Sequence, residues 1–202
     1  MMLDVTLAHQ RQKRYNTLML TKEEKQIILE RKHTASFYAP WANATLFQTI
    51  VENLAEPFRD AAIEKVLGLE ARGFILGAPV AYLLHAGFVV ARKAGNLYKG
   101  RRAVENVLQE SCVDYSGQTK TLEIETHTYG IQPGDRILII DDWFDRGEQG
   151  QAAIRLVERA GGIVAGIGVL FDNMTEEKRK RFQHYHFHAL INEPPSEAIS
   201  NT

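Results

Sequence analysis

The sequence predicts an α/β fold in which a parallel β-sheet is covered by helices on both faces. Residues 137–140 (Ile-Leu-Ile-Ile) form an uninterrupted aliphatic run, which is typical of a strand buried on both faces. From residue 65 onward, strand-like and helix-like patterns alternate, and this alternation favours βαβ units. The chain has 202 residues, of which 45% are hydrophobic, so it is long enough for one substantial core.

The elements before residue 94 follow from capping signals and periodicity. Thr21 and Glu24 form a capping-box pattern ahead of an amphipathic stretch, and Gly87 separates a helical pattern from the strand that follows it. We expect residues 1–45 to form an N-terminal, hood-like extension of a main domain that spans residues 46–202. The signals predict a helix over residues 22–32, an aromatic loop over 37–43, a helix over 46–58, a strand over 65–69, a helix over 74–85 and a strand over 88–93.

The elements of the second half are bounded by turn residues. Pro133-Gly134-Asp135 precedes the central strand, and Gly161-Gly162 separates a helical pattern from the next aliphatic run. These signals predict a strand over residues 137–140, a helix over 151–160, a strand over 163–171, a short charged helix over 175–183 and a last strand over 185–191.

Composition limits the classes of function. The formal net charge is −1 and the isoelectric point is near 6.7, so no global field attracts nucleic acid or an acidic membrane. Cys112 is the single cysteine, which excludes an internal disulfide and fits a reducing compartment. No charged leader with an apolar stretch opens the chain, and its longest uncharged run is too short to span a bilayer. We therefore expect a cytoplasmic protein.

Two adjacent acids follow the central strand. Asp141 and Asp142 are expected at its carboxyl end, where open α/β sheets bind their ligands. Buried unpaired charge is costly, so the pair suits a ligand with vicinal hydroxyls, a metal, or both. An ordinary strand-to-helix turn with solvated acids is the alternative interpretation of this segment.

A second motif is expected at the same edge of the sheet. Glu70-Ala71-Arg72-Gly73 links the strand of residues 65–69 to the helix of residues 74–85. Gly73 and Gly77 let that helix pack close to the sheet, and its positive end faces the same mouth as the acid pair. The motif therefore predicts a site for an anionic ligand group.

These segments resemble the type I phosphoribosyltransferases, and among them the adenine phosphoribosyltransferases. The resemblance covers roughly residues 60–172 and rests on four segments in the family's order. They are the Glu-Ala-Arg-Gly-Phe motif at residues 70–74, the Arg92-Lys93 pair that ends a strand, the Gln-Pro-Gly-Asp lead-in at residues 132–135, and the strand with its acid pair. The implied fold is a type I phosphoribosyltransferase sheet with a mobile arm at about residues 94–121.

The resemblance also implies roles for individual residues. Asp141 and Asp142 bind the ribose hydroxyls of phosphoribosyl pyrophosphate and support the oxocarbenium-like centre. Asp114, in the place of the family's usual glutamate, handles a proton on the purine. The pyrophosphate is held by Glu70, Ala71, Arg72, Gly73, Arg92 and Lys93, and the 5′-phosphate by Asp145, Arg146, Gly147, Glu148 and Gln149. The implied substrates are phosphoribosyl pyrophosphate, as its Mg²⁺ complex, and a purine base. No protein metal site is implied, and the implied assembly is a homodimer.

The loop Asp145-Arg146-Gly147-Glu148-Gln149 departs from the family pattern. That loop is usually small and rich in hydroxyls, whereas this one carries two carboxylates that repel a phosphate and one arginine that offsets part of the repulsion. Three functions stay open. The chain is an active purine phosphoribosyltransferase, or a diverged relative that binds a nucleotide or phosphoribosyl ligand in a regulatory role, or an enzyme acting on a ribosyl group without a 5′-phosphate.

Three other features have two interpretations each. His184, His186 and His188 alternate, which suits either a metal site or, as we favour, a satisfied or exposed strand face. Lys99, Arg101 and Arg102 in the arm either contact pyrophosphate or keep the arm soluble. Trp143 and Phe144 either stack on a base or form a hydrophobic plug behind the loop.

Overall fold

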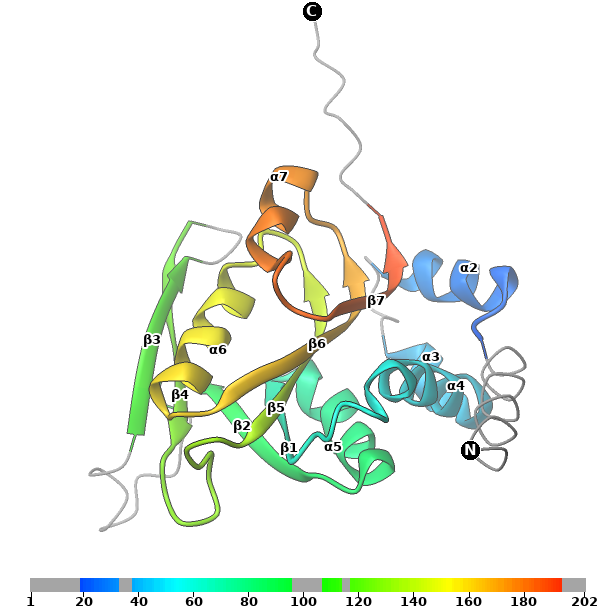
Figure 1. The fold of residues 1–202 in the computed structure, drawn as a ribbon. Coiled ribbons are helices and arrows are strands. Elements are labelled where there is room, and N and C mark those ends of the chain that lie inside the picture. The colour runs from blue at the N-terminus through cyan, green and yellow to red at the C-terminus, as the bar shows by residue number, and fades with distance from the viewer. Residues whose placement is uncertain (1–18, 33–37, 96–106, 114–116, 194–202) are drawn as a thin grey trace, which may run out of the picture.

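The computed structural model describes residues 19–32, 38–95, 107–113 and 117–193, and Figure 1 shows their arrangement. Within these residues, seven strands form a single sheet. They are β1 (Lys65–Leu69), β2 (Gly87–Lys93), β3 (Val107–Val113), β4 (Thr119–Glu125), β5 (Arg136–Phe144), β6 (Ile163–Asp172) and β7 (Phe187–Asn192). The strand order is β3-β4-β2-β1-β5-β6-β7. Strands β2, β1, β5, β6 and β7 are parallel, whereas β4 is antiparallel to both β2 and β3.

Helices lie on both faces of this sheet, as the sequence predicted. They are α2 (Lys22–Arg31), α3 (Ala39–Ala42), α4 (Ala44–Ala55), α5 (Arg72–Leu84), α6 (Glu148–Arg159) and α7 (Glu176–Arg179), with 3-10 turns η1 (Glu56–Phe58) and η2 (Lys180–Phe182). Helices α4 and α5 share one hydrophobic core with β5, whereas α6 shares a second core with the opposite face of β5 (Figure 1). The capping box at Thr21 and Glu24 is present.

Several predicted boundaries need correction. The aromatic stretch expected as a loop contains helix α3, because Pro40 at its start favours helical geometry. Strand β3 lies within the expected arm and β4 begins at its end; the two strands pair antiparallel and were not predicted. Strand β5 runs to Phe144, and α6 begins at Glu148, three residues earlier than expected.

The N-terminal extension was predicted to end at residue 45. In its described part, Leu20 and Ile28 are buried in the same core as Ile50 and Leu138. Helix α2 therefore contributes to the core of the main domain, and a domain boundary at residue 45 stays a prediction. None of the helices within the described ranges is both long and apolar enough to cross a bilayer.

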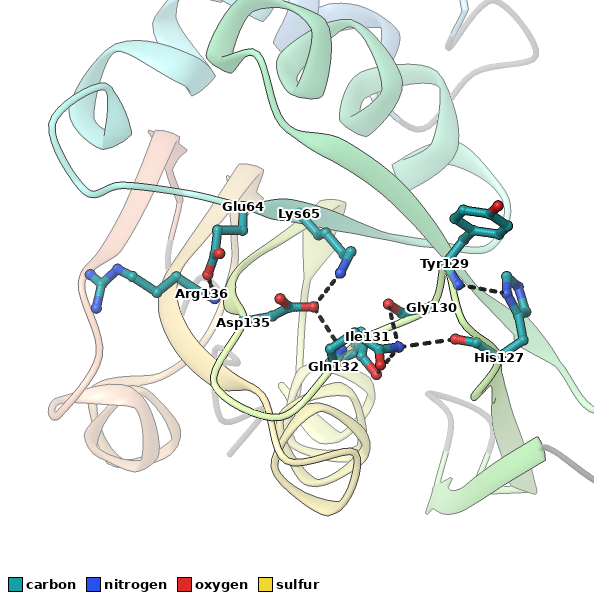
Figure 2. A network of polar contacts seen from close by, with 9 residues as sticks. All are labelled: Glu64, Lys65, His127, Tyr129, Gly130, Ile131, Gln132, Asp135 and Arg136. Atoms are coloured by element: carbon teal, nitrogen blue, oxygen red, sulfur yellow. Dashed lines mark hydrogen bonds and ion pairs between the residues drawn. The ribbon is translucent and has the colours of Figure 1, made fainter.

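Two ionic clusters fix the sheet away from its carboxyl edge. Figure 2 shows that Asp135, just before β5, pairs with Lys65 and accepts the N–H of Gln132 at 2.7 Å. The Arg136 N–H donates to Glu64 at 2.9 Å in the same network. This network therefore anchors the start of β5 to the start of β1.

The second cluster joins the expected arm to α6. On β3, the Glu110 carboxylate accepts hydrogen bonds from Arg155 at 2.8 Å and Arg159 at 2.6 Å. These two arginines lower the pKa of Glu110 by hydrogen bonding to its charged form. Strand β3 is therefore held against the helix that begins at the loop of residues 145–149.

Candidate active site

The acid pair lies at the carboxyl edge of the sheet because β1 is shorter than β5. The pairing of β1 with β5 ends at Gly68 and Ile140, whereas β5 stays paired with β6 from Asp141 through Phe144. The sequence predicted Asp141 and Asp142 at the end of the strand. They lie instead inside β5, which continues to Phe144. They are nevertheless past the last residue of β5 that β1 covers, which is where a ligand can reach them.

Both carboxylates are buried. Asp141 and Asp142 are 5% and 4% exposed, and the Asp142 N–H donates to Asp141 Oδ1 at 2.9 Å. Arg72 Nε lies 3.0 Å from Asp142 Oδ2. Burial raises the pKa of Asp141 well above its ordinary value, and the neighbouring Asp142 charge adds to that rise. Burial also raises the pKa of Asp142, against the attraction of Arg72. The fold therefore holds these two acids at a cost in free energy.

Helix α5 starts directly beside this pair. Its N-cap, Ala71, has no side chain that caps the first turn, so the start of α5 can accept an anion. A Cβ at Gly73 would lie 2.7 Å from the Ile140 carbonyl oxygen and 3.2 Å from Asp141 Oδ1. Only glycine lets the first turn of α5 approach β5 so closely.

The residues around that first turn form a connected group. The Glu70–Ala71 peptide bond is cis, and the Glu70 carboxylate accepts the N–H of Lys93 at 2.7 Å. The Arg92 guanidinium lies 5.5 Å from the centre of the Phe74 ring. The loop before α5 and the end of β2, predicted separately, are therefore in contact.

The loop of residues 145–149 leads into α6. Gly147 has φ 79°, a conformation that favours glycine, and it is the N-cap of the helix. The first helical bond runs from the Gln151 N–H to the Gly147 carbonyl at 2.9 Å, so the N–H groups of residues 148–150 precede the helical ladder. Asp145 and Arg146 are exposed, whereas Glu148 is half-buried. Backbone donors for an anion are thus present despite the two carboxylates.

These segments surround one cavity of about 730 Å³. Of the predicted site residues, those lining it are Glu70, Ala71, Arg72, Lys93, Asp141, Asp142, Asp145, Arg146, Gly147, Glu148 and Gln149. Gly73 and Arg92 are adjacent to these residues in sequence but do not line the cavity. Asp114, Lys99, Arg101 and Arg102 lie outside the described residues.

Some lining residues were not predicted. Tyr38, Val113, Gly150 and Asn173 also line the cavity. Asn173 directly follows β6, and its place after a neighbouring parallel strand was a signal that pointed to this edge. Tyr38 comes from the N-terminal segment and Val113 from the arm, so only the tertiary structure brings them here.

The two aromatic residues after the acid pair have different environments. Phe144 is buried, with ring-centre distances of 5.5 Å to Phe182 and 5.8 Å to Phe187. Trp143 is half-buried, lines the cavity, and packs on Phe171 at 5.2 Å. Phe144 thus packs behind the loop and also lines the cavity, whereas the Trp143 ring has Lys32 Nζ 5.0 Å from its centre.

The three histidines do not share one strand face, which corrects the prediction from the sequence. Only His188 lies in β7, and the Phe58 ring is 4.7 Å from the His186 ring. Burial, followed by the charge of His186, lowers the pKa of His188. Across the described parts of the chain, no three His, Cys, Asp or Glu side chains are grouped to hold a metal ion.

The raised pKa of Asp141 predicts a pH dependence of stability. The folded state binds the Asp141 proton more tightly than the unfolded state, whose carboxyl titrates near 3.8. The free energy of unfolding therefore falls as pH rises from about 4 to the higher pKa of Asp141 in the folded state. Asp141→Asn removes the effect. We expect its gain in unfolding free energy over wild type to be near zero at about pH 4 and to grow with pH. Urea denaturation across a pH series measures this; a gain that shrinks with rising pH contradicts the assignment.

This arrangement defines the class of the protein as an enzyme of α/β fold. Its acid pair, the start of α5 at Gly73 and the loop of residues 145–149 lie around one cavity. The sequence profile of the phosphoribosyl transferase domain matches residues 42–196, more than half of the chain. The chain therefore belongs to the phosphoribosyl transferase domain family, as its motifs predicted, and it is a phosphoribosyltransferase.

Individual relatives agree with this assignment. The chain is 42% identical to an adenine phosphoribosyltransferase of Thermobifida fusca over 131 residues, which are 65% of this chain and 69% of that protein. It is 39% identical to an adenine phosphoribosyltransferase of Desulfitobacterium hafniense over 145 residues, or 72% and 79% of the two chains. The crystal structure of adenine phosphoribosyltransferase from Rhodothermus marinus matches with a TM-score of 0.67 and 39% identity, covering 77% of this chain and 84% of that one.

Proposed function

We propose that this protein transfers the 5-phosphoribosyl group from phosphoribosyl pyrophosphate to adenine and releases pyrophosphate. The observation that carries the proposal is that the acid pair, the loop before α5 and the loop before α6 line the same cavity. Its volume of about 730 Å³ is within the range of small-ligand sites. Similarity to adenine phosphoribosyltransferases supports adenine as the base.

The proposed roles follow from charge. Asp141 and Asp142 accept hydrogen bonds from the ribose hydroxyls, and their negative charge stabilises the positive charge that develops on the sugar as pyrophosphate leaves. The N–H groups at the start of α5, Arg72 and Lys93 stabilise the departing pyrophosphate. The N–H groups of residues 148–150 hold the 5′-phosphate.

Magnesium enters this proposal as part of the substrate. Mg²⁺ usually keeps several waters and is bound through one or two carboxylates together with substrate phosphates. The site fits that mode because it offers the two carboxylates of Asp141 and Asp142. The ion neutralises phosphate charge when it binds with the donor substrate.

Calorimetric titration with Mg²⁺–phosphoribosyl pyrophosphate, followed by a panel of bases, tests the proposal. We expect binding of the donor and a preference for adenine over hypoxanthine, guanine and pyrimidines. If the donor does not bind while adenosine does, the site takes a ribosyl group without its 5′-phosphate. If the donor binds but no base reacts, the protein is a ligand-binding relative that has lost turnover.

We also propose a homodimer, because family resemblance places the Arg92-Lys93 strand near a two-fold interface. Apolar side chains on α5 and β2 support this location: Ile75 is 41% exposed, Tyr82 80% and Phe88 37%. Sedimentation at micromolar concentration is expected to show a dimer, and Tyr82→Glu is expected to shift it toward monomer. A wild-type monomer at these concentrations contradicts the proposal. A cytoplasmic location remains a prediction.

A further inference from the structure

Glu148 is the residue of the loop that fits a phosphate site least well. It is the first residue of α6 and lines the cavity in which we propose that the 5′-phosphate binds. Its side chain is 30% exposed, and one carboxylate oxygen, Oε2, is buried without a hydrogen-bond partner. A carboxylate held here without a counter-charge opposes the binding of a phosphate dianion.

Arg181 supplies a counter-charge from behind the loop. Its Nη1 lies 3.3 Å from Glu148 Oε1, and its Nη2 donates to the Arg146 carbonyl oxygen. Arg181 is not among the residues that line the cavity, although Glu148 and Arg146 are. The guanidinium therefore contacts the loop on the side away from the proposed ligand.

The segment that carries Arg181 is itself fixed against the loop. A Cβ at Gly147 would lie 2.7 Å from Phe182 Cε2 and 2.9 Å from Met174 Sδ, so the loop backbone rests on these two side chains. The Gln151 side chain also donates to the Arg181 carbonyl oxygen at 3.4 Å. Turn η2 thus holds the guanidinium in a defined place relative to Glu148.

We infer that Arg181 is a positioning residue of the 5′-phosphate subsite: it neutralises Glu148, turns its carboxylate toward η2, and holds the Arg146 carbonyl. The inference rests on the proposed function and deepens it. With Glu148 paired, the N–H groups at the start of α6 meet the phosphate without opposition from the Glu148 carboxylate. The loop therefore uses a salt bridge behind it where relatives have small, neutral residues.

A double-mutant cycle tests this inference, with AMP and adenosine as calorimetric probes. Because Arg181 acts through Glu148, Arg181→Gln is expected to weaken AMP binding by about 5- to 20-fold and to leave adenosine binding unchanged. Glu148→Gln is expected to bind AMP a few fold more tightly than wild type. The double variant Arg181→Gln, Glu148→Gln is expected to recover most of the AMP affinity that Arg181→Gln loses. In steady-state kinetics, Arg181→Gln is expected to raise KM for phosphoribosyl pyrophosphate more than it lowers kcat.

Lys180→Gln is the matched control, since Lys180 is exposed on the same turn and does not line the cavity, and it is expected to bind AMP as wild type does. Arg181→Lys keeps the positive charge and is expected to lose less AMP affinity than Arg181→Gln. It replaces Arg181→Gln in the test if that variant does not fold. A double variant as weak as Arg181→Gln overturns the inference, as does equal weakening of AMP and adenosine. A wild type that binds adenosine but not AMP overturns the proposed function instead.

Discussion

Replacing both Asp141 and Asp142 with asparagine is expected to weaken the binding of ribosyl ligands by about 10²- to 10⁴-fold. A hydrogen bond to a charged group contributes about 1.5–3 kcal/mol, and each 1.4 kcal/mol is tenfold in affinity, so losing two such acceptors gives this range. The free energy of unfolding is expected to stay similar or to rise, because burial raises the pKa of both acids in the folded state. Calorimetry with AMP and chemical denaturation measure the two effects.

Asp135→Asn is the matched control for the acid pair. Asp135 precedes the opposite end of the same strand and pairs with Lys65 (Figure 2). Burial raises the pKa of Asp135, but the bonds from Lys65 and the Gln132 N–H outweigh it, and the net pKa is lowered. This residue therefore stabilises the fold at pH values above about 4, and its loss is expected to reduce stability while AMP affinity stays unchanged. Unchanged AMP affinity in the Asp141→Asn, Asp142→Asn variant contradicts the assigned role of the pair.

Gly73→Ala is expected to lower activity by about 10²-fold or more and to destabilise the protein by about 1–3 kcal/mol. The added Cβ would lie 2.7 Å from a backbone oxygen, that of Ile140, so the first turn of α5 must move away from β5. That movement displaces Arg72 from Asp142 and shifts the N–H groups proposed for pyrophosphate. Steady-state kinetics and thermal denaturation measure the two losses.

Gly77→Ala, one turn later in the same helix, is the control for Gly73→Ala. Its added Cβ would lie 3.0 Å from the tip of the Phe88 ring, which can rotate, and 3.4 Å from the Gly68 Cα. We expect a smaller loss of activity than with Gly73→Ala, at a comparable change in stability. Equal loss of activity in the two variants indicates that general packing of α5, and not its start beside the acids, sets the activity.

The parallel strands were predictable because burial on both faces imposes continuous aliphatic runs on the sequence. Strands β3 and β4 were missed since they are half-exposed, and their polar residues, such as those in Gln109–Ser111, hide the alternation within the expected arm. The end of β5 was misplaced because charged residues normally end a buried strand. Here pairing with β6 continues the strand through Asp141 and Asp142.

The site was predictable where a residue belongs to a local motif. The acid pair, Arg72 and the loop of residues 145–149 are each recognisable from neighbours in sequence, and all of them line the cavity. Tyr38, Val113 and Arg181 were not predicted, because segments distant in sequence bring them to the site. The loop carboxylates were expected to repel a phosphate. The charge of Glu148 is paired with Arg181, which is 33 residues away in sequence and could not be recognised as its partner.

The most direct test of the central claim is an assay of transfer itself. Purified protein is incubated with Mg²⁺, phosphoribosyl pyrophosphate and labelled adenine, and the AMP and pyrophosphate formed are quantified together. We predict that AMP and pyrophosphate appear in equal amounts, with adenine preferred over hypoxanthine and guanine, and that the Asp141→Asn, Asp142→Asn variant forms neither. Absence of AMP under conditions where the protein is folded and binds the donor contradicts the claim that this cavity is an adenine phosphoribosyltransferase active site.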